Sequence, residues 1–287
     1  MTILFSGSSS FTGYHFLKEM NKKKIKTIAI FSKKKSFYRD TKSKEIIDSK
    51  LKFIEPCVNT LFGSKKYIKK IKEYKIDTIC FHHFNVGNLN YKHNFQRNLK
   101  QTIYNLENVV SHLSLNKKPK IIYTSSVYQK ISNKNEYLND NSRIQYGLSK
   151  LTVNNVLKYL CRKYKIKFIN IELKNPIGIF EKKKSLPYYL ANNYFQKNQI
   201  NLDNPKRIFK YSLISEISKN YVKSIEINKC VKSKYININV FQFMNLGLDD
   251  DGQSAPSANT VNLEERQGQI ESPSPLAPPS HRLFGTL

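Results

Sequence analysis

Tyr146 and Lys150 are the two side chains with the clearest potential for catalysis in this sequence. They lie four positions apart at the start of a helical segment that we expect to reach about residue 164, so they share one face of that helix. The pKa of a free tyrosine is about 10, but a nearby ammonium favours the phenolate and lowers that value. The pair could therefore act as a general acid and base on a hydroxyl or carbonyl group. An ordinary helical Tyr-x-x-x-Lys pair is the alternative.

The first thirteen residues have the pattern of a phosphate-binding turn. A short apolar run at residues 2–5 leads into Gly7-Ser8-Ser9-Ser10-Phe11-Thr12-Gly13, and helical sequence follows at residues 14–21. Glycine lets the backbone approach a phosphate closely, and a helix N-terminus offers unpaired N–H groups with partial positive charge. A strand, turn and helix without a ligand is the alternative. The residues that we expect to bind the cofactor here are Gly7, Ser9, Ser10, Phe11 and Gly13.

Alternating strands and helices are expected to position these two segments. Apolar runs predict strands at residues 26–32, 51–55, 77–81, 121–123 and 168–173, with helices at 64–74 and 94–113 between them. This alternation predicts an α/β fold with a Rossmann-like, doubly wound parallel sheet. Ligands of such sheets bind outside the C-terminal ends of the strands. We therefore expect Gly7, Ser32, His82 and Thr124 to line one edge of the sheet.

The end of the second predicted strand bears on the choice of cofactor. In a dinucleotide-binding fold an acidic residue there binds the free 2′-hydroxyl of NAD, whereas a basic residue accommodates the 2′-phosphate of NADP. Here the strand ends in Ser32 and Lys33, followed by two more lysines and no carboxylate. The sequence thus leans slightly to NADP over NAD. An ordinary lysine-rich loop is the alternative.

The adjacent residues His82 and His83 raise the question of a metal site. Neighbouring residues of a strand point to opposite faces, and no third ligand has a suitable spacing. The four cysteines are scattered without a CxxC pair, which suits a reducing cytoplasm. We expect no metal, and we assign His82 to the cofactor site.

The charge of the chain is strongly positive. Its 49 Lys and Arg residues against 21 Asp and Glu give a net charge of +28. The excess is mostly lysine spread along the chain, and no nucleic-acid recognition motif accompanies it. A solvated lysine-rich surface is therefore favoured over a nucleic-acid site, and the positive field favours anionic small substrates. There is neither a signal peptide nor an apolar run long enough to span a membrane, which predicts a cytoplasmic protein.

In their order and spacing these motifs resemble the extended short-chain dehydrogenase/reductase family, in its sugar-nucleotide epimerase/dehydratase branch. The resemblance covers roughly residues 2–240. Gly7-x-x-Ser10-x-x-Gly13 is similar to the glycine motif of the family, with Ser10 where the middle glycine usually stands. Tyr146 and Lys150 match the catalytic Tyr-x-x-x-Lys. Thr124, three residues before Val127-Tyr128, is placed like the catalytic hydroxyl, and Asn175-Pro176-Ile177-Gly178 is similar to a segment at the nucleotide-sugar site.

This resemblance implies an NAD(P)-dependent epimerase or reductase that acts on a nucleotide-activated sugar, as in polysaccharide biosynthesis. Tyr146 would exchange a proton with a sugar hydroxyl, and Lys150 would hold the cofactor ribose and lower the pKa of Tyr146. Thr124 would contact the reacting oxygen, with Ser125 as the fallback. Dehydratases of the family carry an Asp-Glu pair where this chain has Ser125 and Ser126. The implied substrate-binding residues are Ser125, Asn175 and Arg207.

Two rival functions remain open: a cofactor-binding relic of the same fold, and a basic nucleic-acid-binding protein. The resemblance also suggests a homodimer.

Three regions are expected along the chain. Residues 1–174 would form the NAD(P)-binding domain with the Tyr146 helix, and residues 175–247 a smaller, truncated substrate lobe. From residue 248 to 287 lysine is absent, and Asp, Pro and Ser dominate. Such a composition favours disorder. We expect this tail to be non-native, for example frameshifted.

Overall fold

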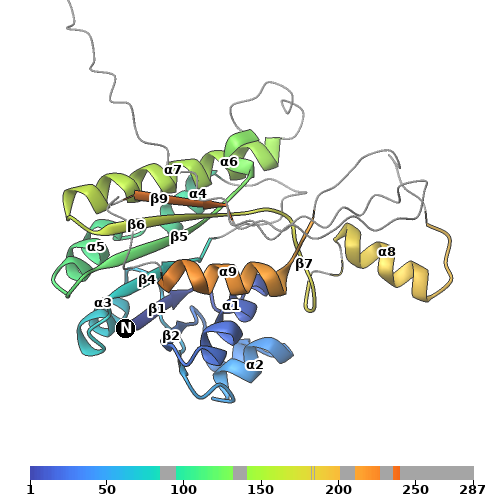
Figure 1. Ribbon diagram of the computed structural model, residues 1–287, viewed down its shortest axis with the longest axis horizontal. Coiled ribbons are helices and arrows are strands. Elements are labelled where there is room, and N and C mark those ends of the chain that lie inside the picture. The colour runs from blue at the N-terminus through green and yellow to red at the C-terminus, as the bar shows by residue number, and fades with distance from the viewer. Residues whose placement is uncertain are drawn as a thin grey trace, which may run out of the picture.

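The computed structural model of the chain describes residues 1–84, 95–131, 141–181, 183, 185–200, 211–226 and 235–239. Its centre is a parallel sheet in the order β3-β2-β1-β4-β5-β6-β9 (Figure 1). The order reverses direction at β1, as a doubly wound sheet requires. The predicted α/β class and doubly wound parallel sheet are confirmed. The strands are β1 (Thr2–Ser6), β2 (Lys26–Ile30), β3 (Ile54–Cys57), β4 (Thr78–Phe81), β5 (Lys120–Ser126), β6 (Lys167–Leu173) and β9 (Tyr235–Asn239).

Helices cover both faces of the sheet, as Figure 1 shows. One face packs on α1 (Phe11–Lys22), α2 (Thr41–Ile47) and α9 (Ile214–Glu226), and the other on α3 (Lys65–Glu73), α4 (Phe95–Thr102), α5 (Leu106–Ser114) and α7 (Asn141–Lys163). Burial on both faces explains why β1, β2 and β4 have nearly continuous apolar sequences. The two layers of helices leave only the strand ends free for a site.

The helix expected over residues 94–113 is wrong: the chain forms two helices, α4 and α5, in its place. The break lies at Asn105, which has a left-handed backbone (φ 54°) and donates its side-chain amide to the carbonyl of Gly63 at 2.8 Å. The helix α2 was not expected. It is capped by Asp40, whose carboxylate accepts the N–H of Ser43 at 3.0 Å.

Elements beyond residue 174 contribute to the main sheet. The strand β9 pairs with β6, and α9 packs on α1, where the Tyr221 ring stacks on Phe16 at 4.0 Å between centroids. The remaining elements of this region are the two-residue strands β7 (Pro176–Ile177) and β8 (Ser212–Leu213), and α8 (Leu186–Phe195). The helix α8 stands apart from the sheet in Figure 1. The residues that we expect to form a separate lobe, 175–247, thus include β9 and α9, which pack with elements of the first domain. The tail at 248–287 lies outside the described residues.

Candidate functional site

A cavity of about 1270 Å³ opens at the C-terminal ends of β1, β2, β4, β5 and β6. The glycine turn after β1 and the helix that carries Tyr146 and Lys150 both contribute residues to this cavity. Phe11 and Gly13 do not line it, and Arg207 lies outside the described residues. The expected site residues that the cavity brings together are Gly7, Ser9, Ser10, Ser32, Lys33, His82, Thr124, Ser125, Tyr146, Lys150 and Asn175.

The glycine turn is tightly fitted against the end of β4. Gly7 has φ +89°, and a Cβ added there would lie 2.9 Å from the backbone nitrogen of His83. A Cβ on Gly13 would lie 2.4 Å from the carbonyl oxygen of Gly7. Both positions therefore require glycine, because backbone atoms cannot move aside as a flexible side chain can. This close packing is what a turn that admits a phosphate needs.

Ser10 fits where the family motif has its middle glycine. Its φ of −75° is open to any residue, and its hydroxyl caps α1 by accepting the N–H of Gly13 at 2.9 Å. The same hydroxyl lies 2.9 Å from the carbonyl oxygen of Gly7. The Ser10 hydroxyl thus bridges the two ends of the turn by hydrogen bonds to Gly7 and Gly13. The N-terminus of α1 remains able to hold a dinucleotide phosphate.

His82 lies beneath the turn rather than in the open part of the cavity. Its Nε2 is 2.8 Å from the Thr12 hydroxyl and 3.1 Å from the Ser10 hydroxyl, while its buried Nδ1 has no hydrogen-bond partner among the residues that the structure describes. Burial lowers the pKa of His82 to about 3 and that of His83 to about 4, so both rings are neutral at pH 7. His82 therefore links the turn to β4.

The end of β2 forms the second wall of the cavity. Lys33 donates its backbone N–H to the Tyr38 hydroxyl at 3.0 Å, and its ammonium lies 5.9 Å from the centre of the Phe37 ring. Two further cations, Arg97 and Lys100 of α4, also line the cavity. Among the described lining residues there is no Asp or Glu. This cavity consequently favours ligands with several negative charges.

Lys150 is buried inside the cavity wall. Its ammonium donates to the carbonyl oxygen of Thr124 at 2.8 Å and lies over the ring of Phe84, 4.4 Å from its centre. The rings of Tyr123 and Tyr146 are 5.3 Å and 5.9 Å away. Burial lowers the pKa of Lys150 to about 7, while the surrounding rings favour the charged form.

Tyr146 lies on the same face of α7, with its side chain partly exposed. Its ring meets Phe84 edge to face at 5.4 Å. Burial raises the pKa of Tyr146, and a hydrogen bond with the Ser126 hydroxyl acts against that rise. In this geometry the pKa of Tyr146 is thus raised by burial, whereas we expected Lys150 to lower it.

The hydroxyls at the end of β5 point in different directions. Thr124 donates to the Tyr221 hydroxyl at 3.4 Å, towards α9, and Ser125 donates to the carbonyl of Ile171 at 3.4 Å. Both line the cavity, as does Ser126, whose hydroxyl accepts the backbone N–H of Tyr128 at 3.4 Å.

One end of the cavity is formed where β6 leads into β7. Asn175 has a left-handed backbone (φ 32°), and its carbonyl accepts the N–H of Ser212 at 3.2 Å. This bond joins the segment after β6 to β8. Asn175 and Pro176 line the same cavity as the hydroxyls at the end of β5.

Several lining residues could not be assigned from the sequence. The aromatic residues Phe84 and Tyr128 follow strand ends, which is the only signal that could have found them. The two cations of α4 lie on exposed turns of a polar helix and give no such signal. The residues concerned are Phe84, Arg97, Lys100, Ser126 and Tyr128.

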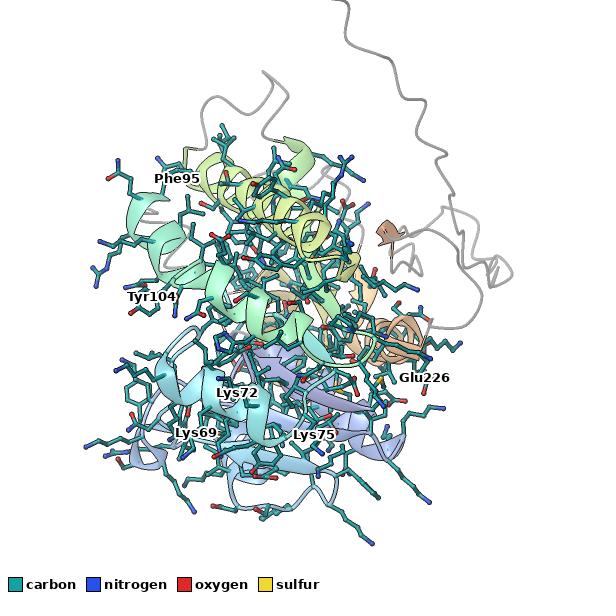
Figure 2. All side chains as sticks on the ribbon, turned by 90° about the vertical axis from the view of Figure 1, so that its left-hand side faces the viewer. Lys69, Lys72, Lys75, Phe95, Tyr104 and Glu226 are labelled. Carbon is teal, nitrogen blue, oxygen red and sulfur yellow. The ribbon has the colours of Figure 1, made fainter. Side chains whose placement is uncertain are left out.

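Outside the cavity, the charge of the chain is spread over the surface. Figure 2 shows the side formed by α3 and α4, where the exposed lysines Lys69, Lys72 and Lys75 are labelled. Within the described part of the chain no group of three His, Cys, Asp or Glu side chains is placed to hold a metal ion. None of the described helices is both long and apolar enough to cross a membrane.

Comparison with models of protein families identifies one family. A model described as the NAD dependent epimerase/dehydratase family matches residues 3–209. No curated protein sequence matches the chain significantly.

Solved structures with similar folds include three epimerases. UDP-glucuronic acid 4-epimerase from Bacillus cereus, in complex with NAD, has a TM-score of 0.63 at 16% identity, over 83% of this chain and 78% of that one. UDP-glucose 4-epimerase from Thermotoga maritima has a TM-score of 0.60 at 13% identity, over 83% and 76%. UDP-N-acetylglucosamine 4-epimerase from Bacillus cereus has a TM-score of 0.57 at 15% identity, over 83% and 75%. At these identities the likeness concerns the fold.

Proposed function

Since the chain belongs to the NAD dependent epimerase/dehydratase family, we propose that it is an epimerase or reductase acting on a nucleotide-activated sugar. The observation that carries this proposal is that Tyr146 and Lys150 line the same cavity as the glycine turn. A cavity of about 1270 Å³ has room for two sizeable ligands side by side.

A nicotinamide dinucleotide bound here would supply hydride transfer at the sugar carbon. The residues present fit such a group: the turn at Gly7 requires a residue without a side chain, and the N-terminus of α1 faces the cavity beside Ser9 and Ser10. The cationic lining matches its phosphates. The residues that would hold it are Gly7, Ser9, Ser10, Ser32, Lys33 and Lys150.

We infer a preference for NADP over NAD. Lys33 stands at the end of β2, where a carboxylate would bind the free 2′-hydroxyl of NAD, and Lys100 adds a second cation to the lining. The name of the matching family and the complex of the Bacillus cereus enzyme both refer to NAD, so the choice needs a direct measurement.

Tyr146 is the proposed general acid and base. Its phenol is held at the cavity by α7, and it would take a proton from or return it to a sugar hydroxyl. Lys150 fixes the end of β5 through the carbonyl of Thr124. A dehydratase is disfavoured, because Ser125 and Ser126 offer no carboxyl group for elimination.

The proposal is tested with purified protein, a panel of UDP-, dTDP- and GDP-sugars, and either an oxidised cofactor (NAD⁺ or NADP⁺), which epimerisation requires, or a reduced one (NADH or NADPH), which reduction requires. Chromatography of the nucleotide sugars should reveal one that is converted to an epimer, or one that is reduced at the expense of the cofactor. Absence of any conversion across the panel, with the cofactor bound, would favour the second candidate below.

That second candidate is a cofactor-binding protein without turnover. Two observations favour it: Phe84 covers the Lys150 ammonium, 4.4 Å from the ring centre, and burial raises the pKa of Tyr146. In this case the Tyr146→Phe variant would bind the cofactor as tightly as the wild type, and neither protein would form products.

A further inference from the structure

The segment directly after β7, residues 178–180, is joined to α1, the helix that follows the glycine turn. The carbonyl oxygen of Ile179 lies 2.9 Å from the Nε2 of His15, although the two residues are 164 positions apart in the chain. The ring of Phe180 meets the ring of Tyr14 edge to face, with 5.2 Å between their centres. A polar and an aromatic contact thus connect this segment to α1.

Neighbouring rings of α1 orient His15 for its hydrogen bond. The His15 ring meets the ring of Phe11 at 5.4 Å and that of Tyr14 at 5.2 Å, both edge to face. The Tyr14 hydroxyl is itself held, because it donates to the carboxylate of Glu45 on α2. A carbonyl oxygen can only accept, so the Nε2 of His15 carries a hydrogen, in the neutral ring as in the charged one. Phe11, which we expected at the cofactor, therefore supports His15 instead.

The other end of the same segment forms part of the cavity wall. Asn175 and Pro176 line the cavity, and the short strand β7 that follows Asn175 has only two residues. Ile179 is 72% exposed, so the burial of its side chain does little to hold the segment in place. The helix α1, in contrast, is fixed in the core, where Phe16 and Leu17 are fully buried. The bond from α1 therefore gives this part of the wall a firm support.

We propose that His15 is a positioning residue for the nucleotide sugar, because it holds the segment that carries Asn175 and Pro176 against α1. The proposal rests on the function proposed above, since it requires a nucleotide sugar to contact this part of the wall. His15 does not line the cavity, so it acts through the segment rather than by touching a ligand. The N-terminus of α1 faces the proposed cofactor site, and one helix thus positions the binding sites of both ligands.

The backbone of the segment supports this role. Phe180 has φ 69°, in the left-handed region that a bulky residue rarely adopts. Such a conformation is unfavourable and persists only where surrounding contacts hold it. The hydrogen bond of His15 reaches the residue directly before Phe180. Loss of this bond should therefore let the segment relax away from α1.

The anchoring is tested without a ligand, by hydrogen exchange of the Glu181 amide, which donates to the Gly178 carbonyl at 3.2 Å. His15→Phe keeps an aromatic ring on α1 but removes the donor, whereas the side-chain amide of His15→Gln can place an N–H near the position of Nε2. We expect exchange to be about 3- to 10-fold faster in His15→Phe, as for the loss of one hydrogen bond, and to recover in His15→Gln. Unchanged exchange in His15→Phe would overturn the proposal.

The matched control is His112→Phe. His112 also lies on a helix surface, but its Nδ1 contacts the carbonyl of Asn108 in the same helix at 2.8 Å, and it does not line the cavity. This variant should leave the exchange of the Glu181 amide unchanged.

Positioning of the ligand is tested by calorimetric titration with UDP, dTDP and GDP, and separately with the reduced cofactor. We expect His15→Phe to weaken binding of the nucleotide that the wild type binds by about 3- to 10-fold, and to change the cofactor affinity by less than about twofold. His15→Gln should restore the nucleotide affinity, and His112→Phe should alter neither affinity. With a converted sugar in hand, KM should rise by the same factor in His15→Phe at nearly constant kcat, because uniform binding is lost.

The outcomes separate this proposal from the proposed function. An unchanged nucleotide affinity in His15→Phe would refute the positioning role and leave the function intact. An equal loss of nucleotide and cofactor affinity would also refute it, because it would show general damage to α1. A wild type that binds the cofactor but none of the nucleotides or sugars would refute the proposed function, and the role of His15 would fall with it.

Discussion

The Lys150 ammonium donates to the backbone carbonyl of Thr124 at 2.8 Å, which ties the helix α7 to the C-terminal end of β5. This bond joins the two segments on which the proposed chemistry depends. The same ammonium is enclosed by Phe84, Tyr123 and Tyr146. Within the described part of the chain, the buried Lys150 ammonium thus has a backbone carbonyl as its partner and aromatic rings around it, and its burial opposes stability at neutral pH.

Lys150→Met should therefore increase stability while it abolishes activity. Burial lowers the pKa of Lys150 from 10.5 to about 7, so the unfolded chain binds more protons than the folded one between those values, and stability rises with pH across that window. Near pH 7 we expect Lys150→Met to raise the free energy of unfolding by about 1–4 kcal/mol, as replacement of buried charges often does. Urea unfolding at pH 7 and pH 9.5 measures the difference, which should shrink at the higher pH. A variant less stable than the wild type at pH 7 would contradict this account of Lys150.

Gly13→Ala should damage the phosphate-binding turn. The added Cβ would lie 2.4 Å from the Gly7 carbonyl oxygen, so either the turn or α1 must move. We expect a loss of about 1–3 kcal/mol in the free energy of unfolding, and weaker binding of the cofactor. Ser10→Gly is the matched control, since a glycine cap costs only a few tenths of a kcal/mol. Equal losses in the two variants, measured by urea unfolding, would show that the tight fit at Gly13 is not decisive.

Most of the architecture could be predicted from the sequence, because apolar runs of strand length alternate with helical periodicity. The Gly7–Gly13 turn and the Tyr146 helix could likewise be placed. The break between α4 and α5 could not, because the apolar stripe continues through Asn105 and the bond of that residue to Gly63 is a tertiary contact.

The free energy of unfolding should fall as the pH drops from about 6.5 towards 4. The pKa values of His82 and His83 are lowered to about 3 and about 4, so the unfolded chain takes up protons in this range that the folded chain does not. At pH 5 this costs about 2 kcal/mol for each histidine, taking about 6.5 as the unfolded pKa. His82→Phe should remove about half of this part of the loss between pH 7 and pH 5. If the variant loses as much stability as the wild type, His82 is not a buried neutral ring.

Lys33→Glu should change the preference between the two cofactors. A carboxylate at the end of β2 repels a 2′-phosphate and can accept a hydrogen bond from a free 2′-hydroxyl. We expect the affinity for NADPH to fall about tenfold, or about 1.4 kcal/mol, relative to that for NADH. Lys72→Glu, at an exposed position of α3 outside the cavity lining, is the control for net charge (Figure 2). A similar change in both variants would mean that Lys33 acts only through the overall field.

Tyr146→Phe tests the central claim most directly. Cofactor binding is followed by energy transfer from protein tyrosines to the reduced nicotinamide, because the chain has no tryptophan to complicate the signal. Conversion of the nucleotide sugar is measured in parallel samples with the oxidised and with the reduced cofactor. We predict that the variant binds the cofactor as the wild type does but loses conversion by on the order of 10²-fold or more. Undiminished conversion of the sugar by Tyr146→Phe would contradict the assignment of Tyr146 as the acid and base.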